Sequence, residues 1–399
     1  MPQLSVEEHR ARIAKLVGAT PIVDLPLADC LGLVLTEDLI SRVPLPPFDN
    51  SAMDGYAVRS ADVTEASRAR PVELPVTADI PAGTTEVAPL RPGTAQRIMT
   101  GAPLPRGADS VVQVELTDAG MPLVRVFSEV RPGTFVRRMG DDVLEGTAVL
   151  TAGTELGPFQ LGLAAAVGVR TLRVWRRPQV LVLSTGSELA SAGQPLLPGH
   201  IYESNGTTLS AAVRSIGGVA RQLDMVPDDV AAFRSALRPH LDWADLVVTS
   251  GGVSAGAYEV VKNALTGQGV EFVRVAMQPG GPQGAGRYQG VPVVSLPGNP
   301  VSAAVSFEVF VKPVLRAAFG HGDDGPPLTF GILGEAVISP AGKRQFRRGR
   351  FERGTGEVFP VGGPGSHLLA ALAHANCLFV VPEEVTELAA GARVEVLPL

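Results

Sequence analysis

The chain has 399 residues, of which 45% are hydrophobic and 19% charged, so it is long enough for more than one core, and two to four domains are expected. Its net charge of −6 disfavours non-specific binding to nucleic acid or to an anionic membrane. It has two cysteines, Cys30 and Cys377, without a CxxC motif, and no signal-peptide pattern, so a cytoplasmic protein without a disulfide framework is expected.

The first predicted element is an amphipathic helix. Ser5 and Glu8 have the spacing of a capping box ahead of a periodic apolar segment, and Gly18 ends that segment. His9, inside this helix, is expected at its surface or boundary. Residues 1–44 and 147–176 are together interpreted as an N-terminal helical and linking domain.

Residues 45–146 are interpreted as a β-rich inserted domain. They are rich in Val, Thr, Pro and Gly, and they contain short alternating runs at residues 110–115 and 123–127. The domain opens with the sequence PPFDNSAMDGYA at residues 46–57. Its two prolines stiffen the chain, and Gly55 permits a backbone angle or a close approach that a Cβ would block. We therefore expect Asp54 to be held on a rigid loop.

From residue 177 onward, predicted strands and helices alternate, which favours a doubly wound parallel sheet over residues 177–325. The strands are expected at residues 180–183, 246–249 and 293–295, and the helices at 207–216, 258–265 and 301–318. Pro326 and Pro327 mark a linker. Residues 326–399 are then expected to form a C-terminal β-barrel-like domain with strands at 330–337, 358–361, 378–381 and 393–396. The fold class is multidomain α/β plus β.

Each of the three buried strands runs into a polar turn that contains glycine. In a parallel sheet such turns gather at the carboxyl edge, where ligands bind. Backbone N–H groups at Gly251 and Gly252 could approach phosphate oxygens closely, whereas any one such turn alone could be an ordinary connection. The candidate ligand-binding residues in these turns are Ser184, Thr185, Ser250, Gly251, Gly252, Ser254, Pro297, Gly298, Asn299 and Pro300.

Acidic side chains near element ends form a second candidate set. Each alone could equally cap a helix or lie in solvent. Together they suit a hard divalent cation such as Mg²⁺, which prefers oxygen ligands and bridges phosphates. The set comprises Asp54, Asp142, Glu188, Asp228, Asp229 and Glu259.

Six ordered motifs resemble the molybdopterin molybdenumtransferases, the MoeA family that includes the gephyrin E domain. They cover nearly the whole chain, and six in order are far more specific than any one. The motifs are PPFDNSAMDGYAV at 46–58, RIMTGAPLP at 97–105, LSTGSE at 183–188, YESNG at 202–206, SGGVS at 250–254 and LPGNP at 296–300.

The resemblance implies an elongated homodimer that inserts molybdate into adenylylated molybdopterin and releases AMP, with a divalent cation. It implies composite active sites, each formed by the parallel-sheet domain of one subunit and the β-rich domain of the other. Other enzymes of the molybdopterin pathway are further candidate partners. The implied catalytic residues are Asp54, Thr100, Glu188 and Asp228, the implied metal ligands are Asp54, Asp142, Glu188 and Glu259, and the implied binding residues include Gln278, Arg287, Arg348 and Ser366 beside the turn residues above.

The chain departs from the family at positions that would carry charge. Where the family commonly has KPGKP, this chain reads Gln278-Pro-Gly-Gly-Pro, and the common GDYD reads Gly256-Ala-Tyr-Glu. Two lysines and one acidic group are absent. We expect Arg287, on the same connection, to compensate partly for the lysines.

Two other functions remain open from the sequence. The parallel-sheet domain also resembles molybdopterin adenylyltransferases, which would make the chain an ATP-dependent nucleotidyl transferase. The missing lysines and acidic group motivate the second alternative, a non-catalytic molybdopterin-binding scaffold.

Overall fold

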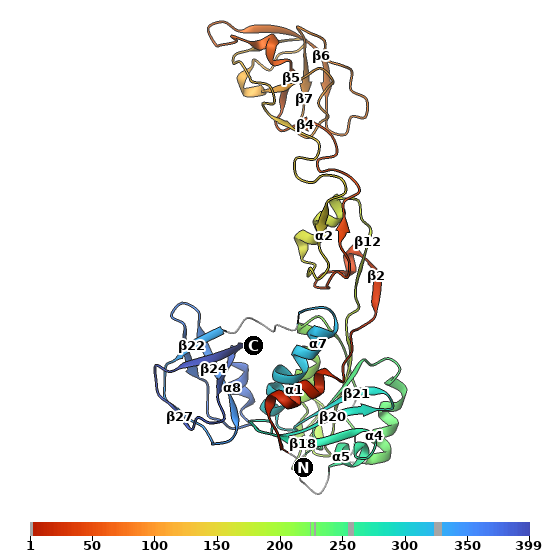
Figure 1. Cartoon of the computed structure of the whole chain (residues 1–399), viewed down its shortest axis with the longest axis vertical. Helices are drawn as coiled ribbons and strands as arrows, with labels where there is room; N and C mark the ends of the chain where they lie inside the picture. The colour runs from red at the N-terminus through yellow and green to blue at the C-terminus, as the bar shows by residue number, and fades with distance from the viewer. Residues whose placement is uncertain (1–2, 224, 227–228, 254–258, 323–328) are drawn as a thin grey trace. The chain divides into compact units, whose positions relative to one another are not determined.

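The computed structural model describes residues 3–223, 225–226, 229–253, 259–322 and 329–399. The chain divides into two compact units (Figure 1). The larger unit comprises Met1–Leu25, Gly32–Thr36 and Arg173–Leu399, and the smaller comprises Pro26–Leu31 and Glu37–Leu172. The finer division into four domains remains a prediction. The Pro326-Pro327 linker lies outside the described residues.

Helix α1 (Val6–Ala14) begins with the predicted capping box. The Glu8 N–H donates to Ser5 Oγ at 3.1 Å, and the Ser5 N–H donates to Glu8 Oε2 at 2.7 Å. These two bonds satisfy amide groups that a helix start leaves without partners. The expectation for His9 was wrong, because its side chain is fully buried and lies edge-on to Phe310, with ring centroids 4.8 Å apart.

The larger unit contains a seven-stranded sheet in which the four strands toward one edge run parallel, as predicted. The antiparallel pairs β18–β20 and β20–β21 make the sheet mixed, since a hairpin lies beside the parallel strands. The sheet order is β1 (Gln3–Leu4), β18 (Val270–Val275), β20 (Pro282–Tyr288), β21 (Val291–Leu296), β17 (Leu246–Ser250), β13 (Gln179–Ser184) and β16 (Val219–Gln222).

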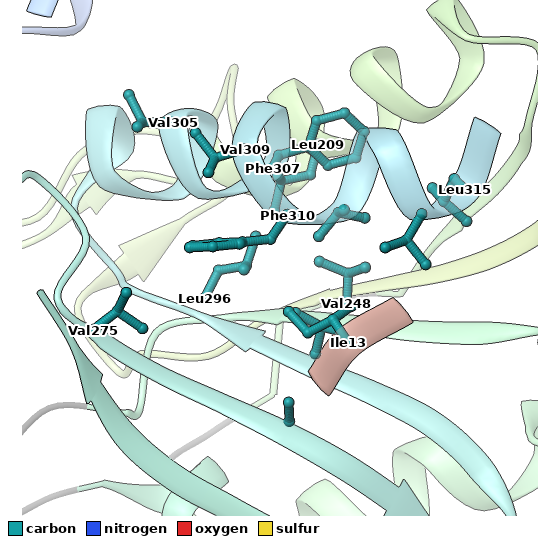
Figure 2. Packing of buried hydrophobic residues seen from close by; sticks show 14 of the residues in the cluster. Ile13, Leu209, Val248, Val275, Leu296, Val305, Phe307, Val309, Phe310 and Leu315 are labelled. Atoms are coloured by element: carbon teal, nitrogen blue, oxygen red, sulfur yellow. The ribbon is translucent and has the colours of Figure 1, made fainter. Parts of the chain in front are cut away.

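Helices cover both faces of this sheet, and the alternation of side chains along each strand divides the core in two. On β13, Val180 and Val182 pack in one cluster with helices α1, α3 and α7, whereas Leu181 and Leu183 pack in the other with α4 and α5. Figure 2 shows the first cluster, where Phe310 and Leu209 lie over Val248 and Ile13. The helices are α3 (Asn205–Ser215), α4 (Val230–Leu237), α5 (Val260–Leu265), α6 (Pro300–Ser306) and α7 (Lys312–Ala318).

The predicted helix at 301–318 is one continuous helical segment with a π-helical turn at Phe307–Val311 between α6 and α7. The sequence gives no sign of this turn. Residue 258, the predicted start of another helix, lies outside the described part of the chain.

The C-terminal strands close into a five-stranded barrel, which confirms the predicted class (Figure 1). Strand β24 pairs with both β25 and β26, and this double pairing closes the ring. A short strand of the α/β part, β19 (Met277–Gln278), pairs in parallel with β24 and ties this barrel to the cavity described below. The barrel strands are β22 (Thr329–Leu333), β24 (Arg344–Glu352), β25 (Glu357–Pro360), β26 (Cys377–Val381) and β28 (Arg393–Pro398), and helix α8 is Leu369–Ala373.

The smaller unit contains a five-stranded sheet in the order β8-β5-β7-β6-β9. Tyr56 on strand β5, which pairs with β7 and β8, is fully buried, so the strand that follows Asp54 is anchored in the core. The strands are β5 (Gly55–Val58), β6 (Val72–Ile80), β7 (Ala95–Ile98), β8 (Ser110–Gln113) and β9 (Leu123–Val126), and the unit also contains helix α2 (Pro158–Ala166).

Candidate active site

The larger unit has a cavity of about 1260 Å³ at the carboxyl edge of its parallel strands. The turns after β13, β17 and β21 all contribute to its wall, so the predicted convergence is observed. The sequence-predicted residues in the wall are Ser184, Thr185, Glu188, Ser250, Gly251, Gly252, Glu259, Gln278, Pro297, Gly298, Asn299, Pro300 and Ser366. Asp228 and Ser254 lie outside the described residues.

The backbone of the turn after β17 requires glycine at two positions. Gly251 has φ +91° and Gly252 has φ +66°, in the left-handed region that L side chains rarely adopt. A Cβ at Gly251 would lie 2.7 Å from the Thr185 carbonyl oxygen, and one at Gly252 would lie 2.9 Å from a Val261 methyl group. The turns after β13 and β17 therefore pack closely enough to exclude any side chain between them.

Two side chains of the YESNG segment, which the sequence analysis did not assign, hold the wall together. Glu203 accepts hydrogen bonds from Ser184 Oγ at 2.8 Å and from the Gly206 N–H at 2.6 Å. Asn205 Nδ2 donates to Ser250 Oγ at 2.8 Å and to the Gly298 carbonyl at 2.7 Å. One segment thus joins all three turns. In the sequence, this segment is marked only by the YESNG motif at residues 202–206.

A loop of the barrel completes the wall with Pro364, Gly365, Ser366 and His367. Asn299 Nδ2 donates to Ser366 Oγ at 2.9 Å, and the Val301 N–H donates to the Ser366 carbonyl at 3.1 Å. Ser366 therefore caps the start of α6. Because α6 begins beside the cavity, this contact fixes the wall between the barrel and the sheet.

Arg348 supports this loop from beneath and is not among the cavity-lining residues. It is 4% exposed, and its guanidinium donates to the Val361 carbonyl at 3.4 Å, the Gly365 carbonyl at 3.2 Å and the Gly363 carbonyl. Burial, with a smaller contribution from the neighbouring Arg347 charge, lowers the pKa of Arg348. The expected direct contact between Arg348 and a substrate anion is therefore not supported.

The charge of the described cavity wall is negative. Glu188, Glu203 and Glu259 line it, and no Lys or Arg belongs to the described wall. Arg287 lies elsewhere, because it is exposed and donates to the Gly290 carbonyl at 2.8 Å and to the Leu16 carbonyl. The expected compensation by Arg287 is not supported by this geometry.

Asp54 and Thr100 lie together in the smaller unit. Asp54 Oδ1 accepts from the Thr100 N–H at 2.6 Å and from Thr100 Oγ1 at 2.8 Å. These two bonds lower the pKa of Asp54, so its exposed side chain is a carboxylate at neutral pH. Asp142, in the same unit, is exposed, and its N–H donates to the Leu45 carbonyl at 2.9 Å.

The predicted metal ligands are divided between the two compact units, Asp54 and Asp142 in one and Glu188 and Glu259 in the other. In the part of the chain that the structure describes, no three His, Cys, Asp or Glu side chains form a cluster that could hold a metal ion. Within the larger unit, Glu188 and Glu259 do line the same cavity.

Three family models match the chain in order: the MoeA N-terminal region (domain I and II) at residues 4–168, the probable molybdopterin binding domain at 181–317, and the MoeA C-terminal region (domain IV) at 331–399. The chain is also 51% identical to molybdopterin molybdenumtransferase 2 of Mycobacterium tuberculosis, with 99% of both chains covered. The chain belongs to the MoeA family. This confirms the resemblance found in the sequence, and with it an enzyme of molybdenum cofactor biosynthesis.

Two further comparisons agree with this family. The molybdopterin molybdenumtransferase of Haemophilus influenzae is 35% identical, over 99% of this chain and 98% of that protein. The crystal structure of the molybdopterin biosynthesis moeA protein from Pyrococcus horikosii has a TM-score of 0.83 and 32% identity, over 99% of this chain and 98% of that one. Among the described residues of the present chain, no helix has the length and apolar character needed to cross a membrane.

Proposed function

We propose that the chain inserts molybdate into adenylylated molybdopterin and releases AMP. The observation that carries this proposal is the cavity itself, in which three glycine-bearing turns converge at the carboxyl edge of a parallel sheet. Thr185 Oγ1 at this wall is buried and has no hydrogen-bond partner among the described residues. A buried polar atom without a partner costs about 1–3 kcal/mol, so a polar ligand group that bonds to it would be stabilised.

The cavity supports specific roles for its residues. The Gly252 N–H suits a phosphate oxygen, because no side chain blocks its approach. The Gly251 N–H already donates to the Leu296 carbonyl at 3.1 Å, so the expected contact of this group with phosphate is not supported. The hydroxyls of Ser184, Ser250 and Ser366 add polar groups to the wall. Asp54 would supply a carboxylate on a fixed loop for the cleavage of the adenylyl bond, with Thr100 holding its orientation.

A divalent cation such as Mg²⁺ fits the donors of the cavity. The described wall has three carboxylates and no Lys or Arg, so it would repel an anionic substrate. A bound cation would offset this repulsion. Mg²⁺ commonly uses one or two protein carboxylates together with waters and substrate phosphates. Glu188 and Glu259 would hold it, and the ion would neutralise charge on the cleaved phosphate.

We further propose that the chain acts as a homodimer with composite sites, in which Asp54 and Thr100 of one subunit serve the cavity of the other. The assignment of these residues and the cavity to separate compact units supports this. Mixing inactive Asp54→Ala subunits with inactive Glu188→Ala subunits should restore part of the activity, because one site of each mixed dimer is intact. Proven subunit exchange without recovery would contradict the arrangement.

The central experiment combines the purified chain with adenylylated molybdopterin, molybdate and Mg²⁺, and measures AMP release and cofactor formation. Formation of both supports the proposal. Consumption of ATP with free molybdopterin would instead indicate the adenylyltransferase alternative, and binding of molybdopterin without turnover would indicate the scaffold.

A further inference from the structure

Gln278 at the cavity wall is paired with Gln345 on the barrel. Strands β19 and β24 run parallel, with the Cα of Gln278 opposite that of Gln345. The Gln345 Nε2 group donates to Gln278 Oε1 at 3.0 Å. Gln345 is 1% exposed, so this amide–amide contact lies beneath the wall rather than in solvent.

A buried arginine determines which way both amides point. Arg347, which is 9% exposed, donates through Nη1 to Gln345 Oε1 at 3.2 Å. A guanidinium can only donate, so the oxygen of Gln345 must face Arg347 and its NH₂ group must face Gln278. The atom of Gln278 that meets this NH₂ group must then be its oxygen. The Gln278 NH₂ group is left as a donor, and no described residue accepts a hydrogen bond from it.

The loop that carries Gln278 is also held from behind. Gln283, which is fully buried, donates through Nε2 to the Gly280 carbonyl at 2.7 Å and to Ser306 Oγ at 2.6 Å. A Cβ at Gly280, which has φ +104°, would lie 2.8 Å from Ser306 Oγ. The backbone of this loop is therefore fixed, and the orientation of the Gln278 amide depends on Gln345.

We propose that Gln345 is a positioning residue that directs the Gln278 NH₂ group into the cavity as a donor to an oxyanion of the ligand. Two lysines of the common family motif are absent from this loop. The neutral, oriented NH₂ group of Gln278 would bind the anion in their place. An NH₂ group donates and does not accept, so this position favours a fully deprotonated oxyanion such as molybdate. The inference rests on the proposed function, and its chemistry fits molybdate or a phosphate group of the substrate.

The test measures binding of molybdate, and separately of inorganic phosphate, to the full-length protein with Mg²⁺ present. In Gln345→Glu, the new carboxylate accepts from both Arg347 and Gln278, so the Gln278 amide turns and presents its oxygen to the cavity. We expect the molybdate Kd to rise about tenfold, the value of one hydrogen bond to a charged group, while the Tm stays the same or rises. Gln278→Met, which lacks the donor, should weaken binding by about the same factor.

The double variant separates orientation from simple charge repulsion. In the Gln278→Met background, Gln345→Glu should change the Kd less than about twofold, because there is no amide left to turn. A full additive effect in that background would overturn the inference, as would Gln278→Met binding molybdate like the wild type. If Gln345→Glu does not fold, Gln345→Met replaces it, with a loss of about threefold expected only when Gln278 is present.

The phosphate measurement identifies the source of the oxyanion. Wild-type binding of phosphate rather than molybdate, weakened by the same variants, assigns the donor to a phosphate group of the substrate. Wild-type binding of neither anion overturns the inference. AMP release is measured separately. If the wild type binds the anion, the variants bind it more weakly, and none of these proteins releases AMP, the positioning role is supported while the proposed function is contradicted.

Discussion

Asp54 Oδ1 accepts two hydrogen bonds from Thr100, one from its N–H at 2.6 Å and one from its hydroxyl at 2.8 Å. The two residues belong to separate sequence motifs, and the bonds join the turns that carry them. The Thr100 hydroxyl donates its hydrogen bond to Asp54, so the lone pairs of its oxygen can still accept a hydrogen bond from another group. Thr100 therefore orients the carboxylate as well as lowering its pKa.

The first prediction concerns this pair. Asp54→Ala should lower AMP release by at least about a hundredfold, the contribution of a group that acts in the chemical step. The variant should still fold, because Asp54 is exposed and its loss removes only the two bonds to Thr100 and no core packing. Thr100→Val should lower the rate less, since the carboxylate remains but loses its orientation. The matched control is Asp242→Ala, at an exposed carboxylate outside the cavity wall. Asp54→Ala activity within about twofold of wild type would contradict the proposed role, because that is only about 0.4 kcal/mol of barrier.

A second prediction concerns the turn after β17. Gly251→Ala places a Cβ 2.7 Å from the Thr185 carbonyl oxygen at a φ of +91°, so strain of about 1–3 kcal/mol is expected in the free energy of unfolding. The control is Gly162→Ala in helix α2, where the new Cβ would meet no heavy atom within 4 Å beyond its own stretch of helix, and a gain of about 0.5–1 kcal/mol is expected. Urea unfolding of both variants checks this. Equal effects would indicate that the turn can relax.

The elements that the sequence predicted well are those with strong local signals. The capping box at Ser5 and Glu8 and the three buried strands were found because their patterns are set by neighbours along the chain. Strand β24 was missed, since its charged sequence around Arg347 and Arg348 is unlike a buried strand, yet both arginines are buried by the barrel.

The turns that line the site could be predicted from the sequence, whereas the side chains that hold these turns together could not. The glycine-bearing turns converged because parallel strands share an edge. Glu203 and Asn205 were missed, since their roles depend on which turns lie beside them in space. Arg287 was expected in the cavity because it is close in sequence, but its guanidinium bonds to the Leu16 carbonyl after α1.

Glu203 gives a third prediction, on the stability of the cavity wall. Glu203→Gln keeps the shape of the side chain but loses the charge that accepts from Ser184 Oγ and from the Gly206 N–H. We expect a loss of about 1–3 kcal/mol in the free energy of unfolding, as for hydrogen bonds to a charged group, and weaker substrate binding. Glu188→Gln, at another wall carboxylate, should reduce activity without a comparable loss of stability. The idea fails if the two variants are equally stable.

The last prediction concerns His9, a buried residue whose two ring nitrogens have no hydrogen-bond partner among the described residues. Burial, together with the Arg12 charge, lowers its pKa from 6.5 to about 4. Above pH 6.5 the ring is neutral in both the folded and unfolded states, so it contributes no pH dependence. Between pH 6.5 and 4 the unfolded state binds a proton that the folded state does not, so stability falls as the pH falls.

The expected size of this loss is roughly 3 kcal/mol between pH 7 and pH 4, levelling off below the folded-state pKa. His9→Leu should remove this part of the pH dependence, so that its unfolding free energy falls less steeply than that of the wild type over the same range. His374→Gln, at an exposed histidine, is the control. Urea unfolding at closely spaced pH values measures both slopes. Parallel curves for wild type and His9→Leu would mean that the ring can be protonated without unfolding, through a local opening of α1 that exposes it to water.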